Sequence, residues 1–347
     1  MRLAETNPVF DVRSPGEYTH AHIPGAHSLP IFSDEERKAI GTTYKQSSRE
    51  KAIKEGLEFF GSRMKDLVEQ AEAALRQELS NKKGGQKPKL LIHCWRGGMR
   101  SNAVAWLLDL YGFECYLLEG GYKSYRNLAL QQFEKPIDLQ LLGGYTGSGK
   151  TEVLEQLSAK GLPIIDLEKI AKHRGSAFGG IGQPEQPSQE MFENLLALEL
   201  MQLSTQDTMF PVWVEDESQR IGKLNIPHAF WKIMRESPVH FLDIPFEERL
   251  KHILSGYQNL DKESLAEAIT RIAKRLGPLE TKTALAHLAE NDFKSCFDIL
   301  LQYYDKTYRK SLLNRENTDE LLNKIPCLSV DTYANIEKLD ICRLQSK

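Results

Sequence analysis

Short apolar runs alternate with longer amphipathic stretches over most of the chain. Runs with the length and composition of buried strands occur at 7–13, 90–93, 114–122, 137–143, 162–168, 210–216 and 238–245. Between them, apolar residues recur every three or four positions, the period of a helix buried on one face, as in EGLEFFGSRMKDLVEQAEAALRQEL. Alternation of strands and helices is typical of parallel sheets covered by helices, so the pattern predicts an α/β fold.

The length of the chain indicates two domains. Its 347 residues exceed the roughly 100–200 that one domain usually contains. The stretch NLALQQFEKP (127–136) follows the early strands, and we expect it to connect the two domains. We therefore expect one domain at 1–130 and a second at 131–347, which ends in a largely helical, polar region.

The composition is that of an ordinary globular protein, with 27% charged and 41% hydrophobic residues. No apolar run reaches the ~18 residues of a membrane span. The N-terminus also lacks the apolar region of a signal peptide. We therefore expect a cytoplasmic protein with no membrane partner. The formal net charge of −3 argues weakly against a strongly basic nucleic-acid-binding domain, but it leaves local basic patches open.

The cysteines predict neither a zinc site nor a disulfide framework. They are scattered and form no C-x-x-C pair; they are Cys94, Cys115, Cys296, Cys327 and Cys342. Cys94 differs from the others because glycines and arginines surround it. We expect the other four to be buried or neutral surface thiols.

The octapeptide GYTGSGKT (144–151) matches G-x-x-x-x-G-K-[ST] between a predicted strand and a predicted helix. The backbone N–H groups of such a P-loop point at phosphate oxygens, and the helix N-terminus adds its dipole. Lys150 would place a cation on the phosphates, and Thr151 could hold Mg²⁺. The motif predicts a polyphosphate site without distinguishing a nucleotide from another diphosphate ester. The predicted diphosphate-binding residues are Gly144, Thr146, Gly147, Ser148, Gly149, Lys150 and Thr151.

A second feature of this domain is the acidic end of the strand in FPVWVEDES (210–218). Glu215, Asp216 or Glu217 at its tip could bind Mg²⁺ through water or act as a base. A solvated acidic strand end is an equally consistent interpretation. No metal ligand set is certain from the sequence.

HCWRGGMRS (93–101) contains C-x5-R in a strand–loop–helix context. The amides of such a loop form a nest for an oxyanion. Arg96, Arg100 and the helix N-terminus would stabilise a thiolate and lower the pKa of Cys94. This makes Cys94 a nucleophile candidate, and a structural cysteine after a buried strand is the alternative. The predicted anion-binding residues are Cys94, Trp95, Arg96, Gly97, Gly98, Met99 and Arg100, of which Cys94, Arg96 and Arg100 are the catalytic candidates.

Two chemistries use such a cysteine loop: a phosphatase forms a phosphocysteine, and a rhodanese carries a sulfane sulfur. DVRSPGEYTHAHIPGAHSLP (11–30) resembles the N-terminal rhodanese signature, and LLEGGYKSY (117–125) resembles its closing segment. Residues 1–130 therefore resemble a rhodanese domain, in which Cys94 corresponds to the chalcogen-carrying position. The rest of the chain is expected to be a P-loop NTPase-like α/β domain with a helical C-terminal region.

The two loops occur together with HRGSAFGGIGQPEQPSQEMFEN (173–194) and VWVEDESQRIG (212–222). This combination resembles the tRNA 2-selenouridine synthase family over essentially the whole chain. The resemblance implies a transferase that acts on the wobble uridine in the anticodon region of tRNA. Geranyl diphosphate would alkylate the sulfur of 2-thiouridine, and selenophosphate would then replace the geranylated sulfur with selenium.

The resemblance also implies partners and roles. Geranyl diphosphate and selenophosphate are the co-substrates, no cofactor is tightly bound, and the enzyme that makes selenophosphate is a further candidate partner. The P-loop would hold the diphosphate of the prenyl donor, and the cysteine loop would accept selenophosphate. Cys94 would either take selenium as a perselenide-like adduct or only position and activate the donor.

Basic residues of the second domain are candidates for RNA binding. Lys306, Arg309 and Lys310 share a helix face because they are three and four positions apart. Tyr303, Tyr304 and Tyr308 lie beside them and could stack on an unpaired base. A solvated helix face with core tyrosines is the alternative. Further candidates for tRNA or diphosphate contacts are His173, Arg174, Ser176, Arg220 and Arg275.

Two other functions remain consistent with the motifs. A rhodanese-type sulfurtransferase fused to an ATP-dependent kinase or NTPase would turn over nucleotide. A non-enzymatic anion sensor would not need Cys94, although the intact C-x5-R loop argues against it.

Overall fold

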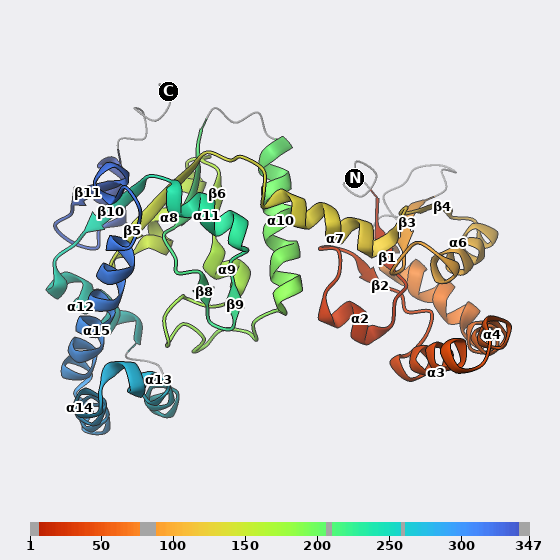
Figure 1. The fold of residues 1–347 in the computed structure, drawn as a ribbon, viewed down its shortest axis with the longest axis horizontal. Coiled ribbons are helices and arrows are strands. Elements are labelled where there is room, and N and C mark those ends of the chain that lie inside the picture. Colours follow the sequence, from red (N-terminus) through yellow and green to blue (C-terminus); the bar gives the residue numbers. More distant parts are fainter. Residues whose placement is uncertain (1–6, 77–87, 206–209, 258–260, 340–347) are drawn as a thin grey trace. The chain divides into compact units, whose positions relative to one another are not determined.

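The computed structural model describes residues 7–76, 88–205, 210–257 and 261–339. The chain divides into two compact units, unit 1 at Met1–Gln131 and unit 2 at Gln132–Lys347 (Figure 1). Each unit contains a parallel sheet surrounded by helices, which confirms the predicted fold class. Cys342 lies outside the described residues.

The sheet of unit 1 is parallel and has the strand order β2-β1-β3-β4. Its strands are β1 (Val9–Asp11), β2 (His27–Ser28), β3 (Lys89–His93) and β4 (Glu114–Leu117). Its helices are α2 (Pro15–His20), α3 (Asp34–Gln46), α4 (Arg49–Ala74), α6 (Met99–Tyr111) and α7 (Gly121–Gln132). Leu90, Ile92 and Cys94 alternate along β3 and its continuation and are buried together with Val104 and Leu108 of α6. The strand period therefore directs Cys94 inward at the carboxyl end of β3.

A buried ion pair fastens the segment that follows β1. Arg13 donates to both carboxylate oxygens of Asp11, at 3.0 and 2.6 Å, and to the carbonyl of Ala21 at 2.7 Å. Its guanidinium also lies 3.9 Å from the ring centroid of Tyr122 in α7. The D-x-R of the sequence signature thus joins β1, the end of α2 and the start of α7 around one cation.

The sheet of unit 2 is also parallel, with the strand order β11-β10-β5-β7-β6. Its strands are β5 (Leu139–Gly144), β6 (Ile164–Ile165), β7 (Val212–Glu215), β10 (Val239–Asp243) and β11 (Leu322–Pro326). All six residues of the central strand β5 are buried. The loop after β5 therefore opens at the carboxyl edge of the sheet, where open parallel sheets bind their ligands.

Helices and a short hairpin complete unit 2. The elements near the sheet are α8 (Lys150–Ala159), α9 (Leu167–Ala171), α10 (Gln189–Thr205), β8 (Arg220–Ile221), β9 (Leu224–Asn225), α11 (His228–Glu236), α16 (Thr318–Leu321) and α17 (Thr332–Glu337). A helical region is formed by α12 (Phe246–Tyr257), α13 (Lys262–Leu276), α14 (Pro278–Ala289) and α15 (Phe293–Leu313). This region has its own apolar core, which includes Leu250, Ile269, Ile272, Leu300 and Leu301.

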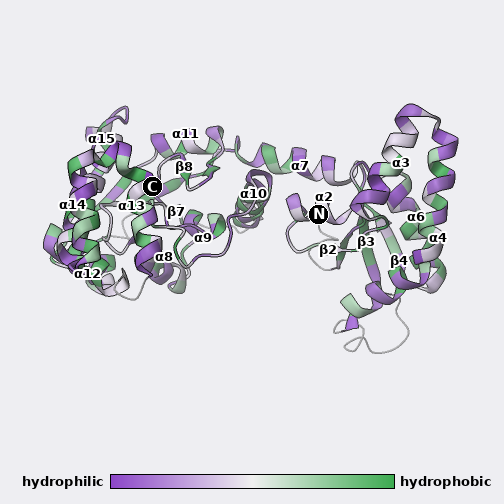
Figure 2. Cartoon of the chain, turned by 90° about the horizontal axis from the view of Figure 1, so that it is seen from below, coloured by the Kyte–Doolittle hydropathy of each residue, from purple (hydrophilic) through white to green (hydrophobic). Residues whose placement is uncertain are grey.

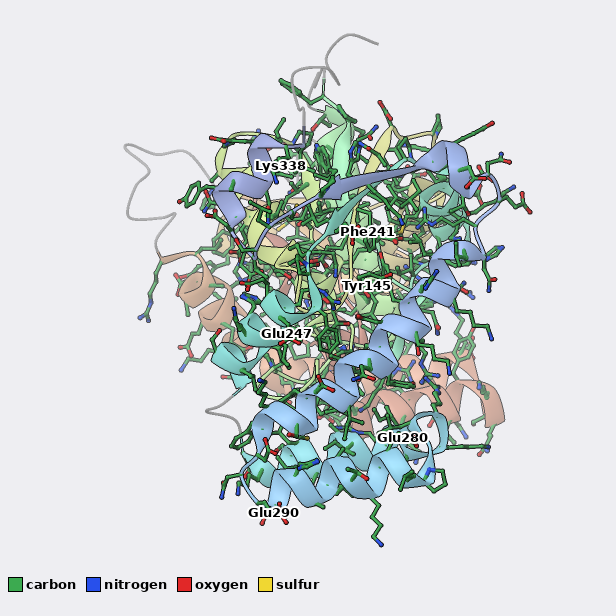
Figure 3. All side chains as sticks on the ribbon, turned by 90° about the vertical axis from the view of Figure 1, so that its left-hand side faces the viewer. Tyr145, Phe241, Glu247, Glu280, Glu290 and Lys338 are labelled. Carbon is green, nitrogen blue, oxygen red and sulfur yellow. The ribbon has the colours of Figure 1, made fainter. Side chains whose placement is uncertain are left out.

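Figure 3 shows α15 running past Tyr145 and Phe241, whose rings make an edge contact at 5.0 Å between centroids. The helical region thus lies against the P-loop. Hydrophilic and hydrophobic residues are mixed along the long helix α4 (Figure 2). Among the described residues, no helix is long and apolar enough to cross a membrane.

Three parts of the structure differ from the sequence prediction. The connection expected at 127–136 is largely helix α7, which buries Tyr122, Tyr125 and Ala129 at helical spacing. Strand β11 lies in a region expected to be helical; it is an edge strand in which only Ile325 is buried, so its apolar signal is weak. The strands β8 and β9 have two residues each, too few for an alternation to be visible.

We expect Arg13→Met to lower the free energy of unfolding of unit 1 by about 3–5 kcal/mol, because it leaves Asp11 buried without its partner. The matched control is Arg37→Met, since the Arg37 side chain is 53% exposed and pairs with Glu17 at 3.3 Å. Its expected cost is below about 1 kcal/mol. Urea denaturation of the full chain measures the free energy of unfolding of each variant, and hydrogen exchange of the β3 amides assigns the loss to unit 1. Equal losses in the two variants would contradict the importance of the buried pair.

Candidate active sites

Cys94 lies at the bottom of a loop between β3 and α6. The side chain is buried, and its Sγ accepts a hydrogen bond from the backbone N–H of Gly98 at 3.3 Å. The hydroxyl oxygen of Ser101, in the first turn of α6, lies 3.4 Å from Sγ and 3.0 Å from the carbonyl of Gly98. The structure therefore gathers backbone and side-chain donors around the sulfur, as the nest interpretation predicts.

Burial raises the pKa of Cys94, but hydrogen bonds outweigh burial and the net pKa lies below its ordinary value. The donors are the Ser101 side chain and the backbone N–H groups of Gly98, Ser101 and Arg96. Burial is also the largest influence on the remaining described cysteines, where hydrogen bonds do not outweigh it and the net pKa is raised. Burial raises the pKa of Cys115 to about 12 and that of Cys296 to about 11, and it also raises the pKa of Cys327. Among the described cysteines, Cys94 is therefore the one whose surroundings favour a thiolate.

The arginines of the loop do not act as expected. The Arg100 guanidinium donates to Glu17 in α2 at 2.8 Å, so a carboxylate neutralises it instead of the thiolate. Arg96 is exposed, and the described residues include no ion-pair partner for its side chain. Hydrogen bonds rather than guanidinium charge therefore lower the pKa of Cys94. Arg96 remains available to an anion that arrives at the loop.

The double-glycine turn before α7 packs directly against the cysteine loop. Tyr122 N–H donates to the carbonyl of Cys94 at 2.9 Å, and Lys123 N–H donates to that of Trp95 at 3.0 Å. A Cβ on Gly121 would collide with the Cys94 carbonyl and the backbone nitrogen of Gly97, and its φ of +60° is unfavourable for other residues. The double-glycine turn thus holds the backbone of the cysteine loop in place. Trp95 and Met99 of the cysteine loop are exposed.

The P-loop joins the buried strand β5 to helix α8. Its left-handed glycines Gly147 and Gly149 have φ of 80° and 71°. Lys150 Nζ donates to the carbonyl of Gly144 at 3.2 Å, which keeps the cation at the loop. The hydroxyl of Ser148 is buried and has no hydrogen-bond partner among the described residues. The loop therefore presents a cation, a free hydroxyl and the N-terminal amides of α8 in one place.

A cavity of about 720 Å³ extends from the P-loop into the helical region. Its polar lining residues include the P-loop, the acidic residues Glu168, Glu215 and Glu217, and two candidates from the sequence, Arg174 and Ser176. Its apolar and aromatic lining residues include Phe178, Phe297, Leu300, Leu301, Leu312 and Tyr304. A cavity lined by both kinds of residue suits a ligand that carries both a phosphate group and a hydrocarbon.

Three glutamates from two segments meet beside Thr151. Its hydroxyl lies 3.1 Å from Glu215 Oε1 and 3.4 Å from Glu168 Oε2, and one oxygen of each glutamate lies within 4.8 Å of the others. Burial and the neighbouring carboxylates raise the pKa of all three side chains, that of Glu168 to about 8. Glu168 was missed by sequence reasoning. It lies two residues beyond the acidic end of a strand, the signal that identified Glu215.

Asp216 is not one of the acidic side chains that meet beside Thr151. One of its oxygens forms a buried ion pair with Arg315, and the other accepts a hydrogen bond from Tyr308 at 2.6 Å. Tyr308 in turn accepts a hydrogen bond from Gly144 N–H at 3.4 Å. Although Asp216 borders the cavity, its carboxylate is used to hold α15 against the P-loop. Glu215 and Glu217 are therefore the acidic residues of this strand end that face Thr151.

The remaining candidates are distributed over unit 2. His173 lies beside Gly222 of the β8–β9 turn and is not part of the cavity, and burial lowers its pKa. Arg220 donates to the carbonyl of Gly222 at 3.0 Å on the exposed hairpin. Arg275 is exposed on α13. The structure thus brings only Arg174 and Ser176 of this group to the P-loop cavity.

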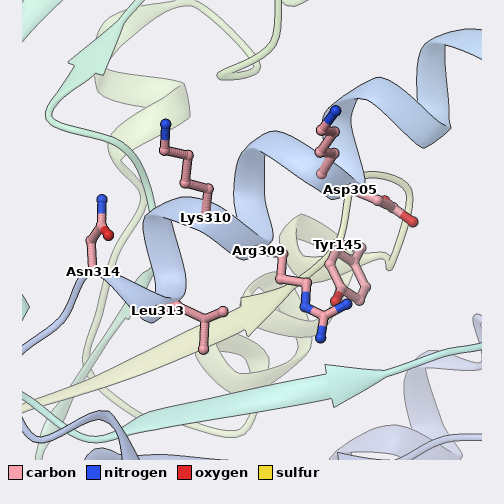
Figure 4. Close-up of a pocket in the computed structure, with 7 residues that line it drawn as sticks. Tyr145, Asp305, Arg309, Lys310, Leu313 and Asn314 are labelled. Atoms are coloured by element: carbon pink, nitrogen blue, oxygen red, sulfur yellow. The ribbon is translucent and has the colours of Figure 1, made fainter.

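Lys306, Arg309 and Lys310 line a separate hollow of about 650 Å³. Figure 4 shows Arg309 of α15 beside Tyr145, the P-loop residue that follows Gly144 and also lines this hollow. Asp305, Leu313 and Asn314 complete this basic pocket. Tyr304 and Tyr308 line the P-loop cavity, and Tyr303 packs against the apolar core of the helical region. The tyrosine among the lining residues of the basic pocket is Tyr145.

Comparisons with known proteins cover both units. A family model described as "tRNA 2-selenouridine synthase AAA domain" matches residues 137–325, and one described as "Rhodanese-like domain" matches residues 1–128. The chain is 37% identical to a tRNA 2-selenouridine synthase of Nitrosomonas europaea over 300 residues, 85% of this chain and 74% of that protein. It is 35% identical to one of Bdellovibrio bacteriovorus and 34% to one of Shewanella denitrificans, with 90% of each chain covered.

We expect Ser101→Ala to raise the pKa of Cys94 and slow its alkylation by iodoacetamide at pH 7 about fivefold. This corresponds to the loss of roughly 1 kcal/mol of hydrogen bonding to the thiolate. Because the thiolate fraction grows as pH rises, the rate profile should move to higher pH. The matched control is Asn102→Ala, since Asn102 donates to the Gly98 carbonyl at 3.0 Å and not to the sulfur. Mass spectrometry of the Cys94 peptide measures the rates, and an unchanged profile in Ser101→Ala would rule out this role.

Proposed function

Because the chain belongs to the tRNA 2-selenouridine synthase family, we propose that it converts 2-thiouridine at the tRNA wobble position to 2-selenouridine in the cytoplasm. The first step is S-geranylation by geranyl diphosphate at the P-loop. The second step is exchange of the geranylated sulfur for selenium from selenophosphate at the cysteine loop. The observation that supports the proposal is the cavity of unit 2, whose lining includes both the P-loop and apolar side chains such as Phe178, Phe297 and Leu301.

In the first step, the 2-thiouridine sulfur attacks the allylic carbon of geranyl diphosphate. A C–S bond forms, the C–O bond to diphosphate breaks, and the N3 proton of the base is released. The negative charge that develops on the leaving diphosphate is stabilised by Lys150, the P-loop amides and the N-terminus of α8, which lie in fixed positions. The apolar lining residues, among them Phe178, Phe297 and Leu301, support binding of the geranyl chain.

In the second step, a C–Se bond forms at C2 of the base and the C–S bond breaks, so that geranyl thiol leaves; the P–Se bond of the donor breaks, and water forms the new P–O bond of phosphate. The selenium of selenophosphate and the departing sulfur have the same oxidation level, so the exchange needs no oxidant. A perselenide on Cys94 would hold more oxidised selenium and would need one. Electron balance therefore favours the role in which Cys94 and its loop amides hold and activate the donor anion.

The competing function is a rhodanese-type sulfurtransferase fused to an ATP-dependent kinase or NTPase. A nucleotide would place the hydroxyl groups of its ribose and the polar edges of its base among lining residues that include Phe178, Phe297, Leu300 and Leu301. These apolar side chains leave such polar groups without hydrogen bonds, so they favour a hydrocarbon over a nucleoside. ATP hydrolysis measured with and without tRNA distinguishes the two functions, since the proposed reaction consumes no nucleotide.

We expect two variants to stop the reaction at different nucleosides. Lys150→Ala removes the cation from the leaving diphosphate and should slow geranylation about 100-fold or more, leaving 2-thiouridine. Cys94→Ser should leave geranylation intact and prevent selenium exchange, so that geranylated 2-thiouridine accumulates. Mass spectrometry of nucleosides from tRNA treated with the purified protein, geranyl diphosphate and selenophosphate measures both products.

The controls are Lys160→Ala, an exposed lysine at the other end of α8, and Cys115→Ser, a thiol of raised pKa in the same unit as Cys94. Both should form 2-selenouridine at the normal rate. Undiminished geranylation in Lys150→Ala would refute the diphosphate role of the P-loop. Normal selenouridine formation in Cys94→Ser would refute the role of the cysteine loop.

We also propose that the basic pocket on α15 contacts tRNA phosphates. Lys306, Arg309 and Lys310 are exposed cations beside an aromatic ring, an arrangement that suits an RNA backbone with an unstacked base. Replacing all three with Ala should weaken tRNA binding and reduce the slope of log K against log salt by about 2–3. The control replaces exposed lysines outside the pocket, Lys160, Lys232 and Lys294. Equal slopes for both triple variants would contradict the assignment.

A further inference from the structure

One face of helix α15 lines the P-loop cavity. The residues of α15 in this lining include Phe297, Leu300, Leu301, Tyr304, Tyr308 and Leu312. Their spacing is that of i, i+3, i+4 and i+7 positions, which share one face of a helix. The cavity therefore follows the axis of α15 over several turns. Since an α-helix rises about 1.5 Å per residue, separation along this face converts directly into length.

Asp305 and Tyr308 mark the part of α15 that lies at the P-loop. The Tyr308 hydroxyl accepts a hydrogen bond from Gly144 N–H at 3.4 Å. Asp305 forms an ion pair at 2.6 Å with Arg249, which also donates to the carbonyl of Thr146 at 3.1 Å. The phosphate-binding end of the cavity therefore lies beside this part of the helix.

Phe297 is the lining residue of α15 that is farthest in sequence from Tyr308, and the separation corresponds to about 16 Å along the helix. Its ring packs against that of Phe178, with 6.1 Å between the ring centroids, and both side chains are buried. Phe178 is itself held by α15, because Ala177 N–H donates to the Tyr304 hydroxyl at 3.1 Å and the rings of Phe178 and Tyr304 meet edge to face. A loop residue and a helix residue thus form a fixed aromatic pair at this depth.

The distance from the P-loop to the aromatic pair matches a prenyl donor of one particular length. An extended geranyl chain, with carbon–carbon bonds of about 1.5 Å, spans about 9 Å. About 7 Å of the separation along the helix then remains for the diphosphate and its contacts at the P-loop. One further isoprene unit, as in farnesyl diphosphate, adds about 5 Å and would extend past the aromatic pair. Phe178 and Phe297 belong to the close-packed core of the helical region, so they do not yield this space without rearrangement.

We propose that Phe297, supported by Phe178, closes the apolar end of the cavity and restricts the prenyl donor to the length of geranyl diphosphate. The inference rests on the proposed geranylation and goes further, since it assigns the selection of chain length to one side chain. Leu300 and Leu301 lie nearer to Tyr308 along the helix, so they would contact the chain without limiting its length.

Replacement of Phe297 by smaller side chains tests this selection. The ratio of kcat/KM for farnesyl diphosphate to that for geranyl diphosphate should rise about 10-fold in Phe297→Leu and up to about 100-fold in Phe297→Ala, because space for the extra unit opens. Phe297→Leu keeps an apolar side chain in the core and still tests the proposal where Phe297→Ala fails to fold. Mass spectrometry of nucleosides from tRNA that contains 2-thiouridine measures the geranylated and farnesylated products.

The matched control is Phe293→Leu, which alters a phenylalanine one turn earlier on α15. Phe293 packs against the same core and is not among the residues that line the cavity. Its ratio should equal that of the unaltered chain. An unchanged ratio in the Phe297 variants, or an equal change in the control, would overturn the proposal.

Isothermal titration calorimetry with geranyl and farnesyl diphosphate measures the same preference without tRNA. In Phe297→Leu, the ratio of the two Kd values should shift toward farnesyl diphosphate by about the same factor. If the unaltered chain binds both diphosphates but transfers neither prenyl group to tRNA, a shifted Kd ratio still supports the role of Phe297 and counts only against the proposed transfer. Failure of the chain to bind either diphosphate would overturn both.

Discussion

Both candidate sites depend on one constraint, the convergence of backbone N–H groups where a buried parallel strand passes into a helix. In unit 1 this occurs between β3 and α6, and in unit 2 between β5 and α8. The strand is fixed by neighbours on both sides, so the loop has little freedom, and left-handed glycines turn its amides inward. An anion bound there gains several donors that need no rearrangement. The side chains added to this common backbone then decide which anion and which chemistry each loop serves.

In unit 2, hydrogen bonds and ion pairs from the helical region hold the backbone of the P-loop. Arg249 of α12 donates to the carbonyl of Thr146 at 3.1 Å and forms an ion pair with Asp305 of α15 at 2.6 Å. Tyr308, one turn further along α15, links Gly144 to Asp216. Helix α15 therefore supports the P-loop on one side and carries the basic pocket on another. An RNA backbone bound to Lys306, Arg309 and Lys310 would therefore contact the same helix that is hydrogen-bonded to the P-loop.

The sequence predicted the two loops and their fold context well, because strand, glycine loop and helix are encoded within a few consecutive residues. It predicted less where partners come from distant segments. The pairing of Arg100 with Glu17 spans 83 positions, and that of Asp216 with Arg315 spans 99, so no local pattern reveals that these charges are already neutralised. Glu168 escaped notice for a related reason. It lies in the first turn of α9, after the two-residue strand β6, and its closeness to Glu215 arises because β6 pairs with β7 in the sheet.

The different side chains of the two loops agree with the different demands of the proposed steps. A departing diphosphate develops charge on an oxygen, which is best stabilised by a fixed cation such as Lys150. A thiol at that position would add nothing. In the cysteine loop, Glu17 neutralises Arg100, Arg96 is exposed, and hydrogen bonds from Gly98 and Ser101 surround the sulfur. The loop that must stabilise a leaving group thus keeps its cation bonded to the loop backbone, while the loop that must activate a donor surrounds a thiolate with hydrogen-bond donors.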